Sequence, residues 1–508
     1  MGKPTFPKQL TGDERGFFAL INRAVFANPF SQEREGLDRQ IAGLSSVASP
    51  GKALAQSVVR IADRMDRLEK EGRARIDLYA GDDRLLMENV FLYDFFHRFL
   101  DRFDRLIIDQ IEAGAEPLPV PFAGEAFAFL HGRGFAADAI RRYFEVVYQL
   151  RRAFFFIDRN LVGCSLSMRK LRKRLWENVF TCDLNLYNRH LWDRMEDFSV
   201  LILGETGAGK GAAAAAIGRS GFIPFDLEKS RFAASFTDSF VEINLSQYPE
   251  NLIESELFGH KKGAFTGAVE DYRGVFDRCS RYGAIFLDEI GEVSAPVQIK
   301  LLRVLQERAY TPVGSQEERR FAGRIIAATN VPLASLRKEG RMRDDFFYRL
   351  CTDIITVPPL RQRIAEDPCE LDGLLAFVVH RLLGKPSEEV TQMVKESVER
   401  RFGRGYAWPG NVRELEQLSR RILINRGNEA VNVETQIELA QTLADAIQSG
   451  TASAQQLVSA YCTLVYERCG TYEEAARRLG LDRRTVKKHV EAWRKKAKTE
   501  EFRIENSA

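Results

Sequence analysis

The sequence LILGETGAGKG, residues 201–211, places a glycine loop between an apolar stretch and an alanine run. The apolar residues favour a buried strand, and Ala212–Ala216 favours a helix. In such a loop, backbone N–H groups and the helix N-terminus hold phosphate, and Lys210 reaches the outer phosphates. A chance glycine-rich turn is the alternative. The residues expected to bind nucleotide are Gly204, Glu205, Thr206, Gly207, Ala208, Gly209, Lys210 and Gly211.

Length and composition exclude several classes of protein. A chain of 508 residues predicts about three domains, and 45% hydrophobic with 29% charged residues is typical of a soluble globular protein. No apolar run approaches the roughly 18 residues of a membrane span, and the N-terminus has no signal-peptide core. Seven cysteines without a CxxC pair indicate reduced thiols. We therefore expect a cytoplasmic protein without a membrane partner.

Residues 1–170 show helical periodicity. Apolar residues spaced by three and four form stripes at Leu54, Val58, Ile61, Met65 and Leu68 and at Leu92, Phe96, Phe99, Phe103 and Leu106. A third stretch covers 140–157, and the prolines of 116–122 predict a loop. The aromatic stripes fit either the core of a helix bundle, which we favour, or a ligand pocket. No acidic cluster precedes alternating strands and helices, which argues against a phospho-acceptor receiver domain.

Two further apolar stretches end in polar residues. Phe240–Asn244 predicts a strand, and Gly283–Glu289 predicts a second one that ends in two carboxylates. This second stretch has the form of a Walker B element, in which Asp288 holds magnesium and Glu289 orients or deprotonates the attacking water. Gly211 stands where Ser or Thr usually supplies a magnesium hydroxyl, so metal binding depends on residues elsewhere.

Residues 321–330 predict another buried strand, which ends at Thr329 and Asn330 near the expected γ-phosphate. Arg343 and Arg349 follow. Arginines near a phosphoryl group can neutralise transition-state charge, which is worth roughly 10³–10⁵ in rate. A surface salt bridge with Asp344 or Asp345 is the alternative for these arginines.

The stretch ESELFGHKKGAFTGA, residues 254–268, carries two glycines around Phe265 and Thr266. An exposed phenyl ring is costly unless it meets a partner, so this loop tip is a candidate contact surface. An ordinary hairpin turn with Phe265 folded back into the core is the alternative.

The C-terminal third is predicted to be helical. Residues 361–430 form one helical segment, in which Arg413 occupies a first helical turn, and 431–455 form a linker. Residues 472–479 and 483–495 predict two helices joined by a turn, with Asp482 as N-cap. Ten Lys/Arg against four Asp/Glu over 471–498 give a local charge of +6. The spacing favours a helix-turn-helix whose second helix presents Arg483, Arg484, Thr485, Lys487, Lys488 and His489 to DNA. A basic hairpin that binds nothing is the alternative.

Together these motifs resemble the AAA+ activators of sigma-54 RNA polymerase, the bacterial enhancer-binding proteins. The resemblance covers about 175–430 and the C-terminal 40 residues, and GAFTGA is its most specific element. It implies a multidomain fold with an α-helical N-terminal domain, an α/β AAA+ P-loop ATPase with a helical lid, and a C-terminal helix-turn-helix. It also implies a hexamer that binds ATP and Mg²⁺, with sigma-54 RNA polymerase holoenzyme and double-stranded enhancer DNA as partners. The expected domains are 1–170, 171–360, 361–430, 431–455 (linker) and 456–508.

The resemblance also assigns roles to residues. The tip that engages sigma-54 comprises Gly263, Ala264, Phe265, Thr266, Gly267 and Ala268. Asn244 matches the residue that couples Glu289 to this tip. Arg343 and Arg349 match arginine fingers that enter the neighbouring subunit's site. Thr329 and Asn330 match sensor I, and Arg413 matches sensor II.

Three stretches depart from the family pattern. The family often has Glu where this chain has Gly211, an insertion is expected near 226–237, and 361–367 carries one extra residue. Two rival functions are a DNA-binding repressor or architectural protein with a decayed ATPase, and an AAA+ remodeller of another client. The intact Asp288, Glu289, Arg343, Arg349 and GAFTGA argue against the first. GAFTGA and the basic C-terminus argue against the second.

Overall fold

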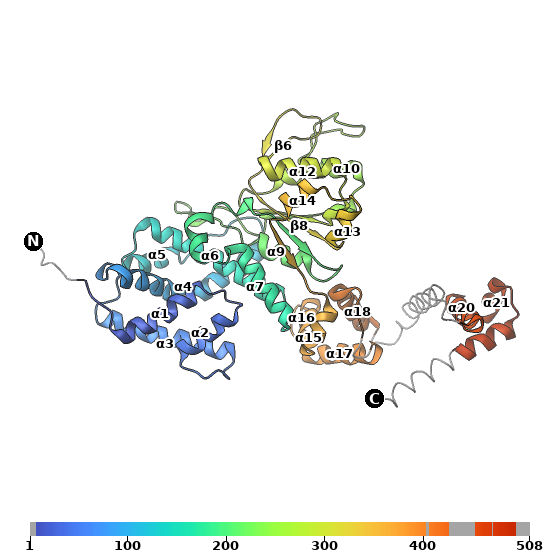
Figure 1. Ribbon diagram of the computed structural model, residues 1–508, viewed down its shortest axis with the longest axis horizontal. Coiled ribbons are helices and arrows are strands. Elements are labelled where there is room, and N and C mark those ends of the chain that lie inside the picture. The colour runs from blue at the N-terminus through green and yellow to red at the C-terminus, as the bar shows by residue number, and fades with distance from the viewer. Residues whose placement is uncertain (1–6, 403–405, 426–452, 470, 494–508) are drawn as a thin grey trace, which may run out of the picture. The chain divides into compact units, whose positions relative to one another are not determined.

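The computed structural model describes residues 7–402, 406–425, 453–469 and 471–493 (Figure 1). The chain divides into two compact units, Met1–Arg381 with Gly405–Leu415, and Leu382–Arg404 with Glu416–Ala508. No helix among the described residues is long and apolar enough to cross a membrane.

The first unit begins with a bundle of helices. Its members are α1 (Gly12–Phe26), α2 (Gln32–Ala42), α3 (Pro50–Lys70), α4 (Gly81–Ala113), α5 (Ala123–Gly132), α6 (Ala137–Asn160) and α7 (Leu166–Phe180). The three stretches with helical periodicity lie in α3, α4 and α6, and 116–122 lies between helices. α1 begins with a capping box, in which Thr11 accepts from the backbone N–H of Glu14 and the Glu14 carboxylate accepts from that of Thr11.

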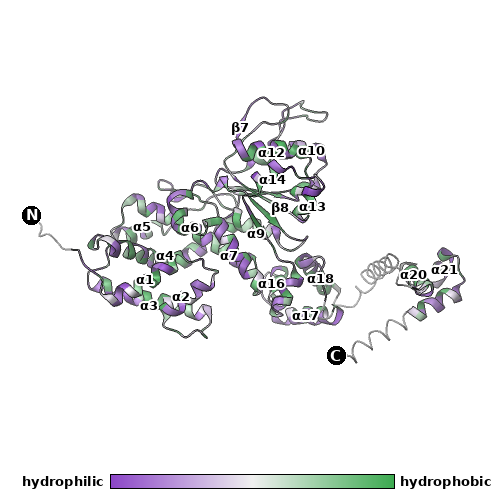
Figure 2. Ribbon diagram, in the orientation of Figure 1, coloured by the Kyte–Doolittle hydropathy of each residue, from purple (hydrophilic) through white to green (hydrophobic). Residues whose placement is uncertain are grey.

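A five-stranded parallel sheet follows the bundle in the chain. Its order is β4 (Phe240–Asn244), β5 (Ala284–Asp288), β8 (Arg324–Thr329), β1 (Val200–Leu203) and β9 (Asp353–Thr356). Val200 pairs with Ile326 on one side of β1 and with Asp353 on the other. All six residues of β8 are buried, and apolar residues dominate this sheet (Figure 2). The α/β arrangement predicted from the sequence is therefore confirmed, and its sheet is parallel.

Alternate residues of each inner strand belong to two separate cores, as the period of two requires. Leu201, Ile285 and Ile325 pack with the helices of one face. Those helices are α10 (Glu250–Phe258), α11 (Val275–Arg278), α12 (Ala295–Glu307), α13 (Leu333–Lys338) and α14 (Asp344–Leu350). The other face, with Val200, Phe286 and Ile326, packs on α9 (Lys210–Gly218) and shares one core with the N-terminal bundle.

The expected insertion joins the bundle to the sheet. It contains a hairpin of β2 (Phe225–Asp226) and β3 (Arg231–Phe232). The Phe232 ring stacks on Tyr148 of α6 with 3.9 Å between centroids. The fully buried Arg152 of α6 donates to the carbonyl oxygens of Arg219 and Gly221, just after α9. A cation there stabilises the C-terminal end of α9. α6 and α7 both contact α9 (Figure 1).

The remaining elements are short strands and helices. The single-turn elements are η1 (Ile76–Leu78), α8 (Leu184–Leu186), η2 (Tyr187–Leu191), η3 (Met195–Asp197), η4 (Leu245–Gln247) and η5 (Ile290–Glu292), and β6 (Ala309–Tyr310) pairs with β7 (Arg319–Arg320). The predicted lid segment contains α15 (Leu360–Glu366), α16 (Cys369–Leu383), α17 (Glu388–Phe402) and α18 (Asn411–Asn425). α20 (Ala454–Cys469), α21 (Tyr472–Leu479) and a helix over 483–493 share a small core that includes Cys462, Ala475 and Val486.

The domain limits stay predictions. α7 spans the expected limit at residue 170, and most of the expected linker, 431–452, lies outside the described residues. Of 456–508, residues 470 and 494–508 also lie outside them.

Candidate nucleotide-binding site

The glycine loop lies between the end of β1 and the start of α9. α9 begins at Lys210, and the Lys210 ammonium donates to the Gly204 carbonyl oxygen at 3.0 Å. Gly207 has φ +76°, and a Cβ there would lie 2.3 Å from the Gly410 carbonyl oxygen. Only glycine fits this position, since both the backbone angle and the close approach exclude a side chain. The loop and the helix N-terminus have the form of a phosphate cradle.

The two carboxylates that end β5 differ in their surroundings. Asp288 Oδ1 accepts from the backbone N–H of Glu289 at 3.0 Å, and Asn244 Nδ2 lies 3.4 Å from Asp288 Oδ2. The structure thus places Asn244 against Asp288, whereas the family resemblance implies coupling to Glu289. Both strands end at the same edge of the parallel sheet, which brings residues 44 apart into contact.

Glu289 points toward the loop. Its Oε2 accepts from the backbone N–H of Asn330 at 3.2 Å, and its Oε1 lies 3.8 Å from Lys210 Nζ. Asn330 Nδ2 donates to Thr206 Oγ1 at 3.0 Å. Thr329 is buried, and its hydroxyl accepts from the backbone N–H of Val331. Asn330 is therefore the member of the predicted sensor I pair whose side chain touches the glycine loop.

The carboxylates near Gly211 determine which side chains could bind magnesium. A Cβ on Gly211 would lie 3.8 Å from Glu242 Oε1 of β4, so this carboxylate lies beside the position where the chain lacks a side chain. Burial raises the pKa of Glu242, and the nearby Asp288 charge raises it further. Carboxylate oxygens suit Mg²⁺, but no group of three or more His, Cys, Asp or Glu side chains among the described residues could hold a metal. Asp288 fits a magnesium that takes its other ligands from nucleotide and water.

Two residues of the predicted helical segment, Arg361 and Asn411, contact the loop from the other side. Arg361 of α15 makes a two-point ion pair with Glu205, at 2.7 and 2.5 Å. This hydrogen-bonded ion pair holds the pKa of Glu205 below its usual range. The fully buried Asn411 donates to Glu205 and to the Thr206 carbonyl oxygen, and it accepts from the backbone N–H of Leu360.

The start of α18 packs directly on the loop. A Cβ on Gly207 would lie 2.8 Å from the Cβ of Arg413, the predicted sensor II. The backbone N–H of Val412 donates to the Gly207 carbonyl oxygen at 3.1 Å. The predicted sensor II and the predicted phosphate loop are therefore neighbours in the fold.

Arg343 and Arg349 lie at the ends of α14. Arg343 forms an exposed, two-point ion pair with Asp345, and Arg349 donates to the Leu305 carbonyl oxygen at 3.2 Å. Within one chain Arg343 therefore makes the surface salt bridge that was its alternative role. An exposed pair of this kind contributes little to stability, so it does not prevent Arg343 from changing partners.

The GAFTGA segment forms a compact exposed tip. Its ends are joined by a hydrogen bond from the Gly263 N–H to the Ala268 carbonyl oxygen at 2.8 Å, and Gly267 has φ +102°. Phe265 is 37% exposed, and its ring lies edge-on to the His260 ring, with 4.9 Å between the two centroids. Thr266 is exposed. The hairpin alternative required Phe265 to fold back into the core, and the structure does not place it there.

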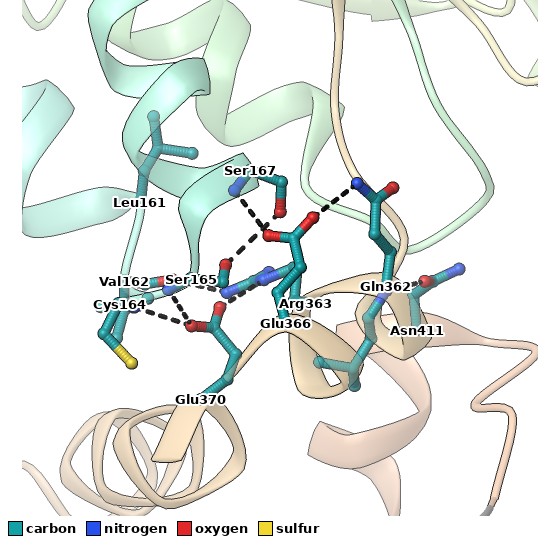
Figure 3. Close-up of polar contacts among 12 residues, drawn as sticks. Leu161, Val162, Cys164, Ser165, Ser167, Gln362, Arg363, Glu366, Glu370 and Asn411 are labelled. Atoms are coloured by element: carbon teal, nitrogen blue, oxygen red, sulfur yellow. Dashed lines mark hydrogen bonds and ion pairs between the residues drawn. The ribbon is translucent and has the colours of Figure 1, made fainter. Parts of the chain in front are cut away.

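A buried polar cluster, absent from the sequence predictions, connects α15 and α16 of the predicted lid to the segment that follows α6 (Figure 3). The Glu370 carboxylate accepts from the backbone N–H groups of Cys164 and Ser165 and pairs with Arg363 at 2.5 Å. Arg363 donates to the Val162 carbonyl oxygen at 2.6 Å. The side chains of Arg363 and Glu370 are 3% and 0% exposed. The sequence did not indicate this cluster, because the residues on its two sides are more than 200 positions apart in the chain, 206 for Cys164 and Glu370 and 201 for Val162 and Arg363.

The predicted DNA contacts divide into two groups. Asp482 accepts from the backbone N–H groups of Arg484 and Thr485, so the predicted N-cap of the helix over 483–493 is confirmed. His489 Nδ1 lies 2.9 Å from the Ser459 hydroxyl of α20, and the Thr485 hydroxyl donates to Asp482. Arg483 pairs with Glu473, and Lys487 with Glu491. Arg483, Arg484, Lys487 and Lys488 are all exposed, whereas Thr485 and His489 are partly buried.

Comparison with known proteins gives matches to the region around this site. Residues 188–356 match the family model described as the Sigma-54 interaction domain. The chain is 40% identical over 247 residues to the DNA-binding transcriptional regulator NtrC of Azospirillum brasilense, which covers 48% of this chain and 47% of that protein. It is 43% identical over 226 residues to the Nif-specific regulatory protein of Azotobacter vinelandii, which covers 44% of this chain and 40% of that protein.

Among solved structures, NtrX from Brucella abortus in complex with ATP overlaps 73% of this chain and 80% of that chain, at 21% identity and a TM-score of 0.40. The chain spans about half the length of the curated relatives it matches. The phosphate loop, the β5 carboxylates and the GAFTGA tip lie inside the matched region. The chain thus carries a sigma-54 interaction domain, and the resemblance to the sigma-54-dependent enhancer-binding proteins is confirmed.

Proposed function

We propose that this chain is a sigma-54-dependent transcriptional activator. It binds enhancer DNA and uses ATP hydrolysis to remodel the closed complex of sigma-54 RNA polymerase into an open complex. The observation that carries the proposal is the exposed GAFTGA tip within the matched Sigma-54 interaction domain. Its described contacts run to His260, Lys261 and Gly314, whereas the phosphate loop contacts Glu289, Asn330 and Arg361.

Hydrolysis would use groups that already converge on the loop. Backbone N–H groups of 207–211 and Lys210 would bind the phosphates, and Mg²⁺ held by Asp288 would neutralise charge on them. Glu289, positioned by the Asn330 N–H, would orient the attacking water and accept its proton. Asn244, Thr329, Asn330 and Arg413 would report the state of the nucleotide to the rest of the domain.

The active state in this proposal is a hexamer. Arg343 and Arg349 would then act on nucleotide bound by the neighbouring subunit, where each would stabilise transition-state charge. The exposed position of Arg343 on α14 supports this role, since its present partner Asp345 lies only two residues away. The helix over 483–493 would bind enhancer DNA through Arg483, Arg484, Thr485, Lys487, Lys488 and His489, of which the four Arg and Lys side chains are exposed.

Thr266→Ala separates an activator from an ATPase with another client. The change removes one hydroxyl and leaves a smaller side chain at an exposed position, so the fold should survive. We expect hydrolysis and hexamer formation near wild-type levels, with nucleotide-dependent sigma-54 binding and open-complex formation lost. All four are measured on one preparation.

Thr266→Ser is the matched control, because it keeps the hydroxyl and should retain sigma-54 binding. If hydrolysis collapses in Thr266→Ala while sigma-54 binding persists, the tip belongs to the active site and the proposal fails. If neither property changes, the client is a different protein.

A further inference from the structure

Gly211 is the second residue of α9, and neither its backbone nor its packing requires glycine. Its φ lies outside the left-handed region, and a Cβ on it would lie no closer than 3.8 Å to any neighbouring element among the described residues. Gly207 of the same loop differs, because a Cβ there would lie 2.3 Å from a carbonyl oxygen. Since glycine destabilises a helix relative to alanine, the missing side chain at position 211 needs another explanation.

The carboxylate of Glu242 lies beside the place where a side chain of residue 211 would begin. Glu242 Oε1 is the nearest atom to that Cβ position, at 3.8 Å, and the Phe286 ring follows at 3.9 Å. Glu242 pairs with Phe286 across β4 and β5, and Phe286 belongs to the core on the α9 face of the sheet. Asn244 and Asp288 form the next pair with the same orientation. Glu242 and Asp288 therefore share one face of the sheet, next to the first turn of α9.

The surroundings of Glu242 favour a cation. In the part of the chain that the structure describes, no hydrogen bond or ion pair holds its carboxylate. Partial burial raises the pKa of Glu242 and the Asp288 charge raises it further, whereas the Arg219 cation lowers it without forming an ion pair. A divalent cation bound near both carboxylates would stabilise their ionised forms.

P-loop proteins usually have a hydroxyl at position 211 that faces magnesium. We propose that Glu242 is a positioning residue for the Mg²⁺ of bound ATP and supplies from β4 the polar side chain that Gly211 lacks. No group of three or more His, Cys, Asp or Glu side chains among the described residues could hold a metal, and Mg²⁺ usually keeps several waters. Glu242 therefore acts on the water ligands of the ion. The inference rests on the proposed ATP hydrolysis and not on the sigma-54 role.

Glu242→Gln tests the charge in the full-length protein, with metal and nucleotide varied separately. Mn²⁺ replaces Mg²⁺, and electron paramagnetic resonance measures its binding to protein saturated with ATPγS. We expect about tenfold weaker Mn²⁺ binding, as for other groups that orient the ligands of a metal. ATPγS in EDTA should bind as tightly as to wild type or more tightly, because a negative charge near the phosphates is gone. Glu250→Gln, at an exposed position in the first turn of α10, is the matched control and should change neither affinity.

The two affinities distinguish a role in metal binding from a structural role. Mn²⁺ binding of Glu242→Gln equal to that of wild type overturns the proposal. Equal weakening of Mn²⁺ binding and of metal-free ATPγS binding also overturns it, because it would indicate damage to the fold. Wild-type protein that binds no ATPγS would overturn the proposed hydrolysis together with this inference, whereas the first two outcomes leave the hydrolysis standing.

A double variant moves the carboxylate from the strand to the helix. Gly211→Glu combined with Glu242→Ala should restore Mn²⁺ affinity to within about threefold of wild type, since position 211 then supplies its own side chain. Gly211→Gln combined with Glu242→Ala is the matched control, which lacks the charge and should stay weak. Restoration by both double variants, or by neither, overturns the proposal.

Discussion

Glu289 is held in an unusual backbone conformation, with φ +56°, in the left-handed region that non-glycine residues seldom occupy. Such strain persists only where the surroundings fix it. Here the Asn330 N–H and the Lys210 ammonium both face the Glu289 carboxylate. The strain therefore aims one carboxylate at the glycine loop while the adjacent Asp288 faces Asn244.

Glu289→Gln tests whether the Glu289 carboxylate takes part in hydrolysis. Gln keeps an acceptor for the Asn330 N–H but cannot accept a proton from water. We expect ATP affinity to stay within about threefold of wild type and turnover to fall at least about 100-fold. Calorimetry measures the ATP affinity, and phosphate release measures the turnover. Glu292→Gln, in the adjacent turn, is the control and should hydrolyse normally. Turnover of Glu289→Gln within about twofold of wild type would remove the residue from catalysis.

The sequence predicted the residues of this site unevenly. Lys210 and Asp288 stand out because each follows an apolar strand in a pattern set by local chemistry. Glu205 was predicted only as a member of the glycine loop and Arg361 was not predicted to contact it, since either charge alone is typical of a solvated surface. Their pairing depends on the lid folding back over 156 residues of chain. For His489 the sequence showed a basic helix face but not the hydrogen bond with Ser459 of the neighbouring helix, because that contact depends on how the two helices pack.

At the scale of elements, α15 contacts two other parts of the chain, the glycine loop and the segment after α6. Arg361 holds the glycine loop, while Arg363 and the following Glu370 hold the segment after α6 (Figure 3). The Arg363–Glu370 pair is buried, and burial lowers the pKa of Arg363. Removing one partner of such a pair leaves an uncompensated charge in the interior.

Glu370→Gln is therefore expected to lower the free energy of unfolding by about 3–5 kcal/mol in urea titration. The double variant Arg363→Met, Glu370→Leu removes both charges but strands the N–H groups of Cys164 and Ser165, so it should recover only part of the loss. Glu366→Gln, on the exposed side of α15, is the matched control and should change stability by less than about 1 kcal/mol. A loss below that value in Glu370→Gln would show that the cluster is solvated.

Elements were predictable where one face of a regular repeat is buried. The stripes of α3, α4 and α6 repeat every three to four residues, and the apolar runs of β1, β5 and β8 are continuous because helices cover both faces of the sheet. The β2–β3 hairpin was visible only as extra length. Its strands have two residues each, which is too short to show a periodic pattern. The role of Phe225 and Phe232 is visible only in the structure, where their rings pack on aromatic rings of α6.

At the scale of the first compact unit, the N-terminal bundle and one face of the sheet share a single hydrophobic core through α9. Elements that share a core open together, so their stabilities should be linked. Nucleotide bound at the start of α9 should then stabilise α4 of the bundle as much as it stabilises β8 of the sheet.

Hydrogen exchange on the Glu289→Gln protein measures this linkage. At an ATP concentration 100 times the dissociation constant, the most protected amides of both α4 and β8 should gain about 2.7 kcal/mol. Unliganded protein sets the baseline, and the helix over 483–493, in the second compact unit, is the internal control that should gain nothing. Increased protection of β8 with unchanged α4 would show that the bundle unfolds by itself.

The hairpin that stacks on α6 also has a consequence for how such a chain can change over evolutionary time. A domain joined by a linker can be exchanged for another by recombination, since each half keeps its own interior. Here a cut between bundle and sheet would expose Phe225, Phe232 and Phe236, whose rings now pack against the helices of the bundle. We therefore expect the two parts to be inherited as one block, with the insertion and the bundle that it contacts changing together.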